Sequence, residues 1–153
     1  MVVRVQSEAF NIATEISALT RGRSDVGAVV TFTGLCRDEG GSLAALEIEH
    51  YPGMAEEEIA RVIEEAQGRW PLQGVTVVHR HGRIAAGEEI VLVVTLSAHR
   101  KAAFEAAEFL MDYLKTSAPF WKKELRLSAE AGGGWVEAKA SDSVDADRWR
   151  KLG

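Results

Sequence analysis

Two lysines, Lys115 and Lys122, flank a forced break in the segment YLKTSAPFWKKE at residues 113–124. Pro119 lies between them and disfavours helix at Ala118, so the chain is expected to leave a helix near this point and change direction. The break could aim both amines into one pocket, where a lysine can act as a nucleophile or proton shuttle. The alternative is that Lys115 is a solvated charge, because a cation is favourable at any helix C-terminus.

The residues after the proline favour the pocket. Phe120 and Trp121 are expected to anchor a turn by burial. Lys122 and Lys123 leave that anchored turn, so at least one of the two amines should have a fixed direction.

A second group of basic residues begins the preceding helix, in the segment SAHRK at residues 97–101. Ser97 is a plausible N-cap, and His99, Arg100 and Lys101 follow where a helix dipole favours acidic residues. A bound anion would remove this conflict, because a helix N-terminus already attracts anions. The alternative is that these side chains point to solvent or pair with acids elsewhere.

Arg37 and Cys36 follow an apolar strand, where a sheet can present reactive groups. The arginine could favour a Cys36 thiolate that carries a persulfide. A small, buried cysteine is the commoner situation. His50, His79 and His81 lack further ligands at metal-binding spacing, so we expect core histidines and no metal site.

The elements that must position these residues alternate irregularly between strand and helix. β-Branched or alternating stretches predict strands, and apolar residues at helical spacing predict helices. The expected strands are 2–5, 26–34, 43–51, 75–82, 89–98 and 135–138, and the expected helices are 10–19, 52–70 and 99–115. The segment RIAAGE would join the fifth strand to the fourth as a hairpin. This order predicts an α+β fold with two long helices and a mixed or antiparallel sheet.

The bulk properties predict one domain spanning residues 1–153. A net charge of −5 gives the whole chain no electrostatic reason to bind nucleic acid or an anionic membrane. The single cysteine excludes an intramolecular disulfide, and the N-terminus lacks the apolar core of a signal peptide. A cytoplasmic location is expected.

Five segments of the sequence resemble the large, catalytic subunit of molybdopterin synthase. The long block SAHRKAAFEAAEFLMDYLKTSAPFWKKE is the most specific of them. The others, in the same order as in the family, are GAVVTFTGLCRDE, IEHYPGM, RWPLQGVTVVHRHG and WVEAK. The resemblance implies a hammerhead-like α/β fold with an additional small antiparallel sheet.

The resemblance also implies a reaction without a cofactor. Such subunits act on cyclic pyranopterin monophosphate, also called precursor Z. A small ubiquitin-like partner delivers two sulfurs as a C-terminal Gly-Gly thiocarboxylate, which makes the dithiolene of molybdopterin during molybdenum cofactor biosynthesis. The family forms a heterotetramer built on a dimer of large subunits.

Site residues carry over position by position from this resemblance. Lys115 and Lys122 match the two essential lysines, which also contact substrate. Further matches to substrate-binding positions are Arg37, His99, Arg100 and Lys123, and Phe32 and Met111 match pocket-wall positions.

Two positions depart from the family pattern. Lys139 stands where the family often has an arginine that is thought to reach the neighbouring subunit, and lysine loses bidentate phosphate geometry. Cys36 stands where the family often has another residue, so a required thiol is not expected.

Two other functions compete with this hypothesis. A Cys36-dependent sulfurtransferase would carry the sulfur itself and would lose activity in Cys36→Ser. A non-catalytic subunit would only bind a pterin or a protein tail, and its lysine variants would weaken binding alone.

Overall fold

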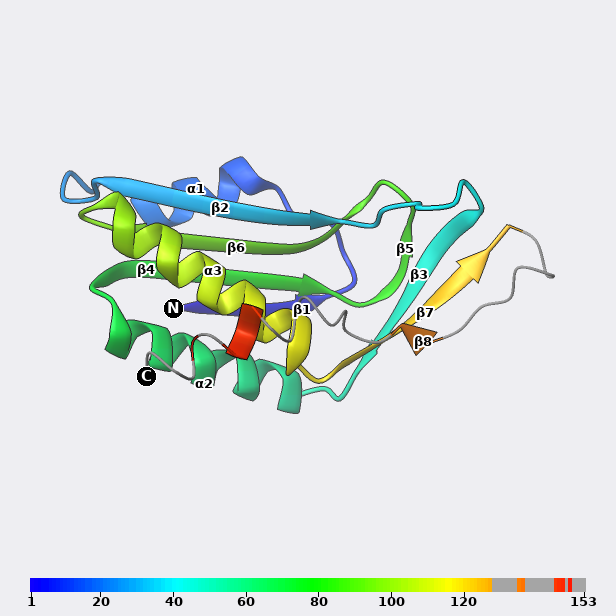
Figure 1. The fold of residues 1–153 in the computed structure, drawn as a ribbon. Helices are drawn as coiled ribbons and strands as arrows, with labels where there is room; N and C mark the ends of the chain where they lie inside the picture. Colours follow the sequence, from blue (N-terminus) through cyan, green and yellow to red (C-terminus); the bar gives the residue numbers. More distant parts are fainter. Residues whose placement is uncertain (128–134, 137–144, 148, 150–153) are drawn as a thin grey trace.

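The computed structural model describes residues 1–127, 135–136, 145–147 and 149, which form two sheets with helices around them (Figure 1). The first sheet is mixed, because its edge strand β1 runs parallel to β4 while the other neighbours are antiparallel. The apolar strand β6 pairs on both sides and is central, as its sequence predicted. In spatial order the strands are β1 (Val2–Gln6), β4 (Leu72–Arg80), β6 (Glu89–Ser97) and β2 (Ala28–Leu35).

Helices cover both faces of the first sheet. Helix α1 (Ile12–Thr20) lies behind it in Figure 1, over a small apolar cluster that includes Leu92 and Leu96. Helices α2 (Met54–Arg69) and α3 (Arg100–Thr116) cover the other face, where the larger core forms. No helix in the described part of the chain is long and apolar enough to cross a membrane.

The second sheet is small and wholly antiparallel. In spatial order its strands are β5 (Gly82–Ala85), β3 (Leu43–His50), β7 (Phe120–Arg126) and β8 (Trp135–Val136). The predicted α+β class, with two long helices and an additional antiparallel sheet, is therefore confirmed.

The predicted hairpin between β4 and β6 is correct in its pairing but wrong in its connection. The segment RIAAGE contains most of β5, which leaves the first sheet and pairs with β3. Gly82 permits the departure because its φ of 84° is a left-handed conformation that other residues rarely adopt. Ile84 then becomes fully buried between the sheets, which stabilises the strand.

Two local predictions around the basic segments are also wrong. Ser97 is not the N-cap of α3; it ends β6, and its buried hydroxyl donates to the Pro71 carbonyl at 2.9 Å. His99 is the N-cap and has no side-chain capping bond. Phe120 and Trp121 form the start of β7 rather than a buried turn, and Trp121 remains 42% exposed.

A glycine at the start of β2 allows a close approach to the residue before His99. A Cβ atom on Gly27 would lie 2.0 Å from the Ala98 carbonyl oxygen. The Gly27 N–H also donates to the Ser97 carbonyl at 3.1 Å, so a hydrogen bond holds the two backbone segments together at this point.

We therefore expect Gly27→Ala to lower the free energy of unfolding by about 1–3 kcal/mol, because backbone must move to relieve the overlap. Urea unfolding measures the change. Gly68→Ala is the matched control, since Gly68 lies in exposed helix with no atom near its Cβ position. In this control variant the free energy of unfolding should rise by about 0.5–1 kcal/mol. Equal unfolding midpoints for Gly27→Ala and the wild type would contradict the close approach.

His79 is a buried titratable group of β4, with 3% of its surface exposed. Burial lowers its pKa from 6.5 to about 3, and the nearby charges of Lys122 and Lys115 act in the same direction. The Nδ1 atom lies 2.8 Å from the Arg80 carbonyl oxygen, a bond that acts in the opposite direction.

The burial of His79 makes the free energy of unfolding depend on pH. The unfolded chain binds a proton at His79 below pH 6.5, whereas the folded chain binds it only near pH 3. The contribution of neutral His79 to the free energy of unfolding should therefore be complete above pH 6.5. It should decline as the pH falls towards 3, by at most about 1.4 kcal/mol per pH unit. Urea unfolding of His79→Phe, which cannot titrate at this position, should show a shallower decline in that window. Identical slopes would show that His79 titrates normally.

Candidate active site

A pocket of about 470 Å³ lies where the end of α3 meets the two sheets. Arg37 after β2, Lys115 on α3 and Lys122 on β7 all line it. The structure thus brings together three cations that the sequence placed at a strand end, a helix end and beyond a break. The rest of the wall is Leu35, Glu39, Gly40, Leu43, Leu46, Ile90, Glu124 and Arg126.

The end of α3 determines where Lys115 lies. The helix stops at Thr116, whose hydroxyl donates to the Asp112 carbonyl at 2.7 Å. Pro119 cannot supply the N–H that a longer helix would need, so the chain turns and begins β7 at Phe120. The predicted early end of the helix is confirmed, and it places Lys115 beside the incoming strand.

The register of β7 determines which of its side chains reach the pocket. Lys122 pairs with Ile48 of β3, and alternate residues of a strand share a face. Lys122 and Glu124 therefore line the pocket. Lys123 and Trp121 are exposed and alternate with Lys122 and Glu124 along the strand, so they lie on its opposite face. The structure therefore does not bring the Lys123 side chain to the pocket.

A second cavity of about 700 Å³ adjoins the first and shares Leu35, Arg37 and Lys115 with it. Phe32 lines this cavity, in the position expected of a wall residue. Met111 lies one helical turn before Lys115, but it is buried in the core and lines neither cavity. Lys115 consequently faces both cavities from the end of its helix.

The wall of the first pocket is positively charged overall. Its charged side chains among the described residues are four cations and two carboxylates: Arg37, Lys115, Lys122, Arg126, Glu39 and Glu124. Glu39 forms an ion pair with Arg37, and Glu124 forms one with Arg126. Four cations against two carboxylates leave an excess of positive charge, which favours an anionic ligand on a chain whose net charge is −5.

Arg126 is a pocket residue that sequence reasoning missed. It follows Lys122 and Glu124 at the spacing of a strand face, and it also donates to the Ser42 hydroxyl at 3.4 Å. The segment was interpreted as a turn anchored by aromatics. Recognising the alternation from Lys122 to Arg126 as a strand would have included this arginine.

Cys36 lies in the second cavity wall but is only 1% exposed. Burial raises the pKa of its thiol, and the Lys122 charge opposes this only as a minor contribution. A buried, protonated thiol is a poor sulfur nucleophile. The site therefore gives Cys36 the properties of a packed core residue.

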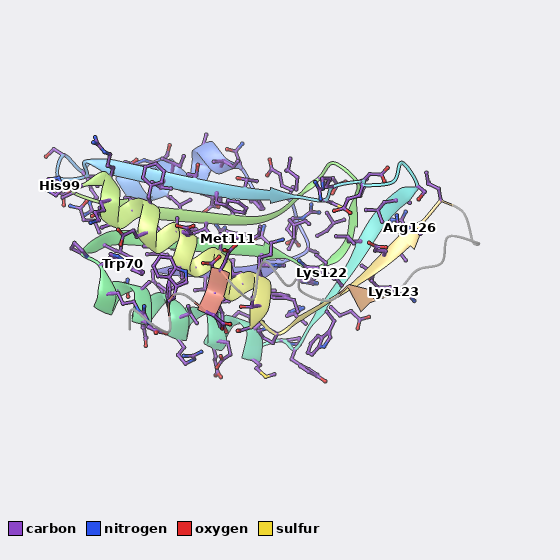
Figure 2. All side chains as sticks on the ribbon, viewed as in Figure 1. Trp70, His99, Met111, Lys122, Lys123 and Arg126 are labelled. Carbon is purple, nitrogen blue, oxygen red and sulfur yellow. The ribbon has the colours of Figure 1, made fainter. Side chains whose placement is uncertain are left out.

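The basic start of α3 does not lie in this pocket. His99 and Arg100 are exposed, and neither makes a side-chain hydrogen bond or ion pair with another described residue. They are separated from Lys115 by nearly the whole of α3, about 24 Å at 1.5 Å per residue. Figure 2 shows His99 at one end of the molecule and Lys122 well away from it, beyond Met111 of α3. Within one chain, these two sets of cations are not brought together.

Two remaining predictions concern Lys139 and a metal. Lys139 lies outside the described residues. Within the described ranges, no group of three or more His, Cys, Asp or Glu side chains could hold a metal ion. His50 and His81 approach each other, with ring centroids 4.4 Å apart.

Comparison with known proteins gives matches over most of the chain. The model of the MoaE protein family matches residues 5–117. The molybdopterin synthase catalytic subunit of Mesorhizobium japonicum is 67% identical over 148 residues, covering 97% of this chain and 92% of that protein.

Solved structures agree with these matches. The structure of the molybdopterin biosynthesis MoaE protein from Burkholderia ambifaria superposes with a TM-score of 0.82 at 42% identity, covering 97% of each chain. The complex of subunits 1 and 2 of molybdopterin-converting factor from Helicobacter pylori gives a TM-score of 0.70 at 21% identity, covering 86% of this chain and 92% of that one. At that identity the second likeness shows the fold alone. Its similarity to molybdopterin synthase catalytic subunits extends over nearly its whole length. By family match, sequence identity and fold together, the chain belongs to the MoaE protein family.

Proposed function

We propose that this chain is the catalytic subunit of a cytoplasmic molybdopterin synthase and acts as a sulfurtransferase. It moves two sulfur atoms from the C-terminal thiocarboxylate of a small ubiquitin-like carrier to cyclic pyranopterin monophosphate, and it uses no cofactor. The observation that carries the proposal is the pocket that unites Arg37, Lys115 and Lys122. Both reactants are anions, so both suit its positive wall.

The reaction requires the pocket to supply positive charge and to transfer protons. In each transfer the carrier's sulfur forms a bond to a side-chain carbon of the pterin while a C–O bond of that carbon breaks and its oxygen leaves. Water then hydrolyses the bond between that sulfur and the carrier's carbonyl carbon. The carrier leaves as an ordinary carboxylate. Lys115 and Lys122 share two tasks, polarising the carbonyl as negative charge develops on its oxygen and moving protons.

Arg37 supplies a planar guanidinium for the cyclic phosphate. An incoming phosphate would compete with Glu39 for this guanidinium. The side chain of Lys123 is exposed on the other face of β7. Its part in the site is therefore limited to its backbone, which belongs to the strand that carries Lys122.

A second copy of the chain completes the site with His99 and Arg100. Strand β2 is an edge strand, and His99 lies near its start while Arg37 follows its end. Two antiparallel β2 strands related by a two-fold axis would bring the start of one beside the end of the other. That arrangement carries His99 and Arg100 of one copy across about 26 Å, the length of an eight-residue strand, to the pocket of its partner.

The surface around β2 suits such an interface. Four large apolar side chains are exposed on β2 and the adjacent part of α3: Val29, Phe32, Leu35 and Phe104. An edge strand with apolar side chains is a ready site for association with another chain. By the family resemblance, Lys139 is a further candidate for a cation shared between copies, although it is a lysine where the family often has an arginine.

We expect Lys115→Ala and Lys122→Ala each to lower kcat for dithiolene formation at least about 100-fold, because each removes a charge needed in the transition state. The assay combines the purified chain with thiocarboxylated carrier and cyclic pyranopterin monophosphate. Lys101→Ala is the matched control, since Lys101 is an exposed lysine elsewhere on α3.

Cys36→Ser separates this proposal from its sulfur-carrying rival. It should turn over at a rate close to the wild type, whereas loss of turnover in the folded variant would assign the sulfur to Cys36. If the lysine variants bound both reactants more weakly but turned over normally at saturation, the chain would be a binding subunit only.

Subunit mixing tests the shared site. Lys122→Ala and Arg100→Ala should each be inactive alone, but joint unfolding and refolding should restore about a quarter of wild-type activity. Half of the random dimers are mixed, and each mixed dimer contains one intact site of two. Mixing Lys122→Ala with Lys115→Ala is the control and should restore nothing, because both residues belong to the same side of the site. No recovery in the first mixture would show that the site does not cross between copies.

A further inference from the structure

Among the described residues, the buried histidine His79 is held in one orientation on the face of β4 that supports the active site. Its Nδ1 atom lies 2.8 Å from the Arg80 carbonyl oxygen, which can only accept a hydrogen bond. The ring therefore carries its proton on Nδ1, and this bond fixes the plane of the imidazole.

The imidazole stacks on Phe120, which belongs to the other sheet. The ring centroids are 3.8 Å apart and the planes differ by only 12°. His50 of β3 lies near the same phenyl ring, at 6.1 Å between centroids. Phe120 is thus packed against both sheets at the point where β7 begins.

Phe120 determines where Lys122 emerges. The two residues are separated by two positions on β7, so their side chains lie on the same face of the strand. β7 follows the break at Pro119, and no helix continues into it. A contact that fixes the first residue of β7 therefore also fixes the direction of the Lys122 side chain two residues later.

A histidine suits this place because it is aromatic and uncharged there. Burial keeps the pKa of His79 at about 3, so the ring is neutral at physiological pH. Lys122 and Lys115 both lie within electrostatic reach of it. A neutral ring supports these two cations without repelling them, which a charged side chain would do.

We propose that His79 is a positioning residue of the sulfur-transfer site, which acts by stacking on Phe120 and so holding β7 and the Lys122 amine in place. The inference rests on the role proposed above for Lys122. It assigns no contact between His79 and the reacting atoms.

The test compares His79→Leu with His79→Phe. Both variants are apolar and both lose the bond to the Arg80 carbonyl, but only phenylalanine keeps a flat ring for stacking. His79→Leu should lower kcat for dithiolene formation by about 10- to 100-fold with the KM for the carrier unchanged, because a displaced catalytic group slows the chemical step. His79→Phe should stay within about threefold of the wild type on the same reasoning. Equal losses, or a larger loss in His79→Phe, would overturn the proposal.

The same contact can be removed from the other side. Phe120→Leu should reproduce the loss in kcat, and the double variant with His79→Leu should lose no more than either single variant, because the residues act through one contact. Additive losses would contradict a shared role. Phe120→Leu also keeps the test open if His79→Leu fails to fold.

A readout independent of activity separates this inference from the proposed function. Amide hydrogen exchange over residues 120–126 should quicken in His79→Leu and not in His79→Phe. Normal turnover by Lys122→Ala would end the role proposed for that lysine, while the exchange comparison would still decide whether the stack holds β7. If Lys122→Ala is inactive but both His79 variants exchange and turn over alike, only the positioning role fails.

Discussion

The forced end of α3 at Thr116 is the constraint on which the candidate site depends. Pro119 denies the helix a further N–H, so within three residues the chain turns from helix into strand β7. Because β7 pairs with β3 in a fixed register, Lys122 is delivered beside Lys115. A helix one turn longer would carry the chain past the second sheet and separate the two amines. The same turn brings Phe120 against the first sheet, so the break both creates the pocket and joins the two sheets.

Positive charge is concentrated in this pocket, although the chain as a whole is negatively charged. The net charge is −5, yet four cations and two carboxylates line the wall among the described residues. Each carboxylate forms an ion pair with an arginine, Glu39 with Arg37 and Glu124 with Arg126. Such exposed or half-exposed pairs contribute little to stability. An anionic substrate can therefore replace a carboxylate at an arginine at low energetic cost.

The sequence predicted most elements, because their apolar periodicity is strong and their breaks are marked by proline and glycine. It also predicted that Lys115 and Lys122 share a pocket, since the break between them is local. It could not predict that β5 joins another sheet, because that depends on long-range pairing with β3. Arg126 was missed because its segment was interpreted as a turn, although the alternation from Lys122 is that of a strand. The separation of His99 from Lys115 by a helix length follows from the predicted helix over 99–115, whereas the matching motifs by themselves carry no distances. That separation leads to the proposal of a site shared between two copies.

The central claim is that the pocket transfers sulfur from a carrier's thiocarboxylate to an anionic pterin without supplying sulfur itself. The most direct measurement labels the carrier's thiocarboxylate with heavy sulfur and weighs the dithiolene product by mass spectrometry. The account predicts that both product sulfurs carry the label, since Cys36 is buried and its thiol pKa is raised. Product containing unlabelled sulfur would place a sulfur carrier on the chain, and the absence of product with all components present would contradict the reaction itself.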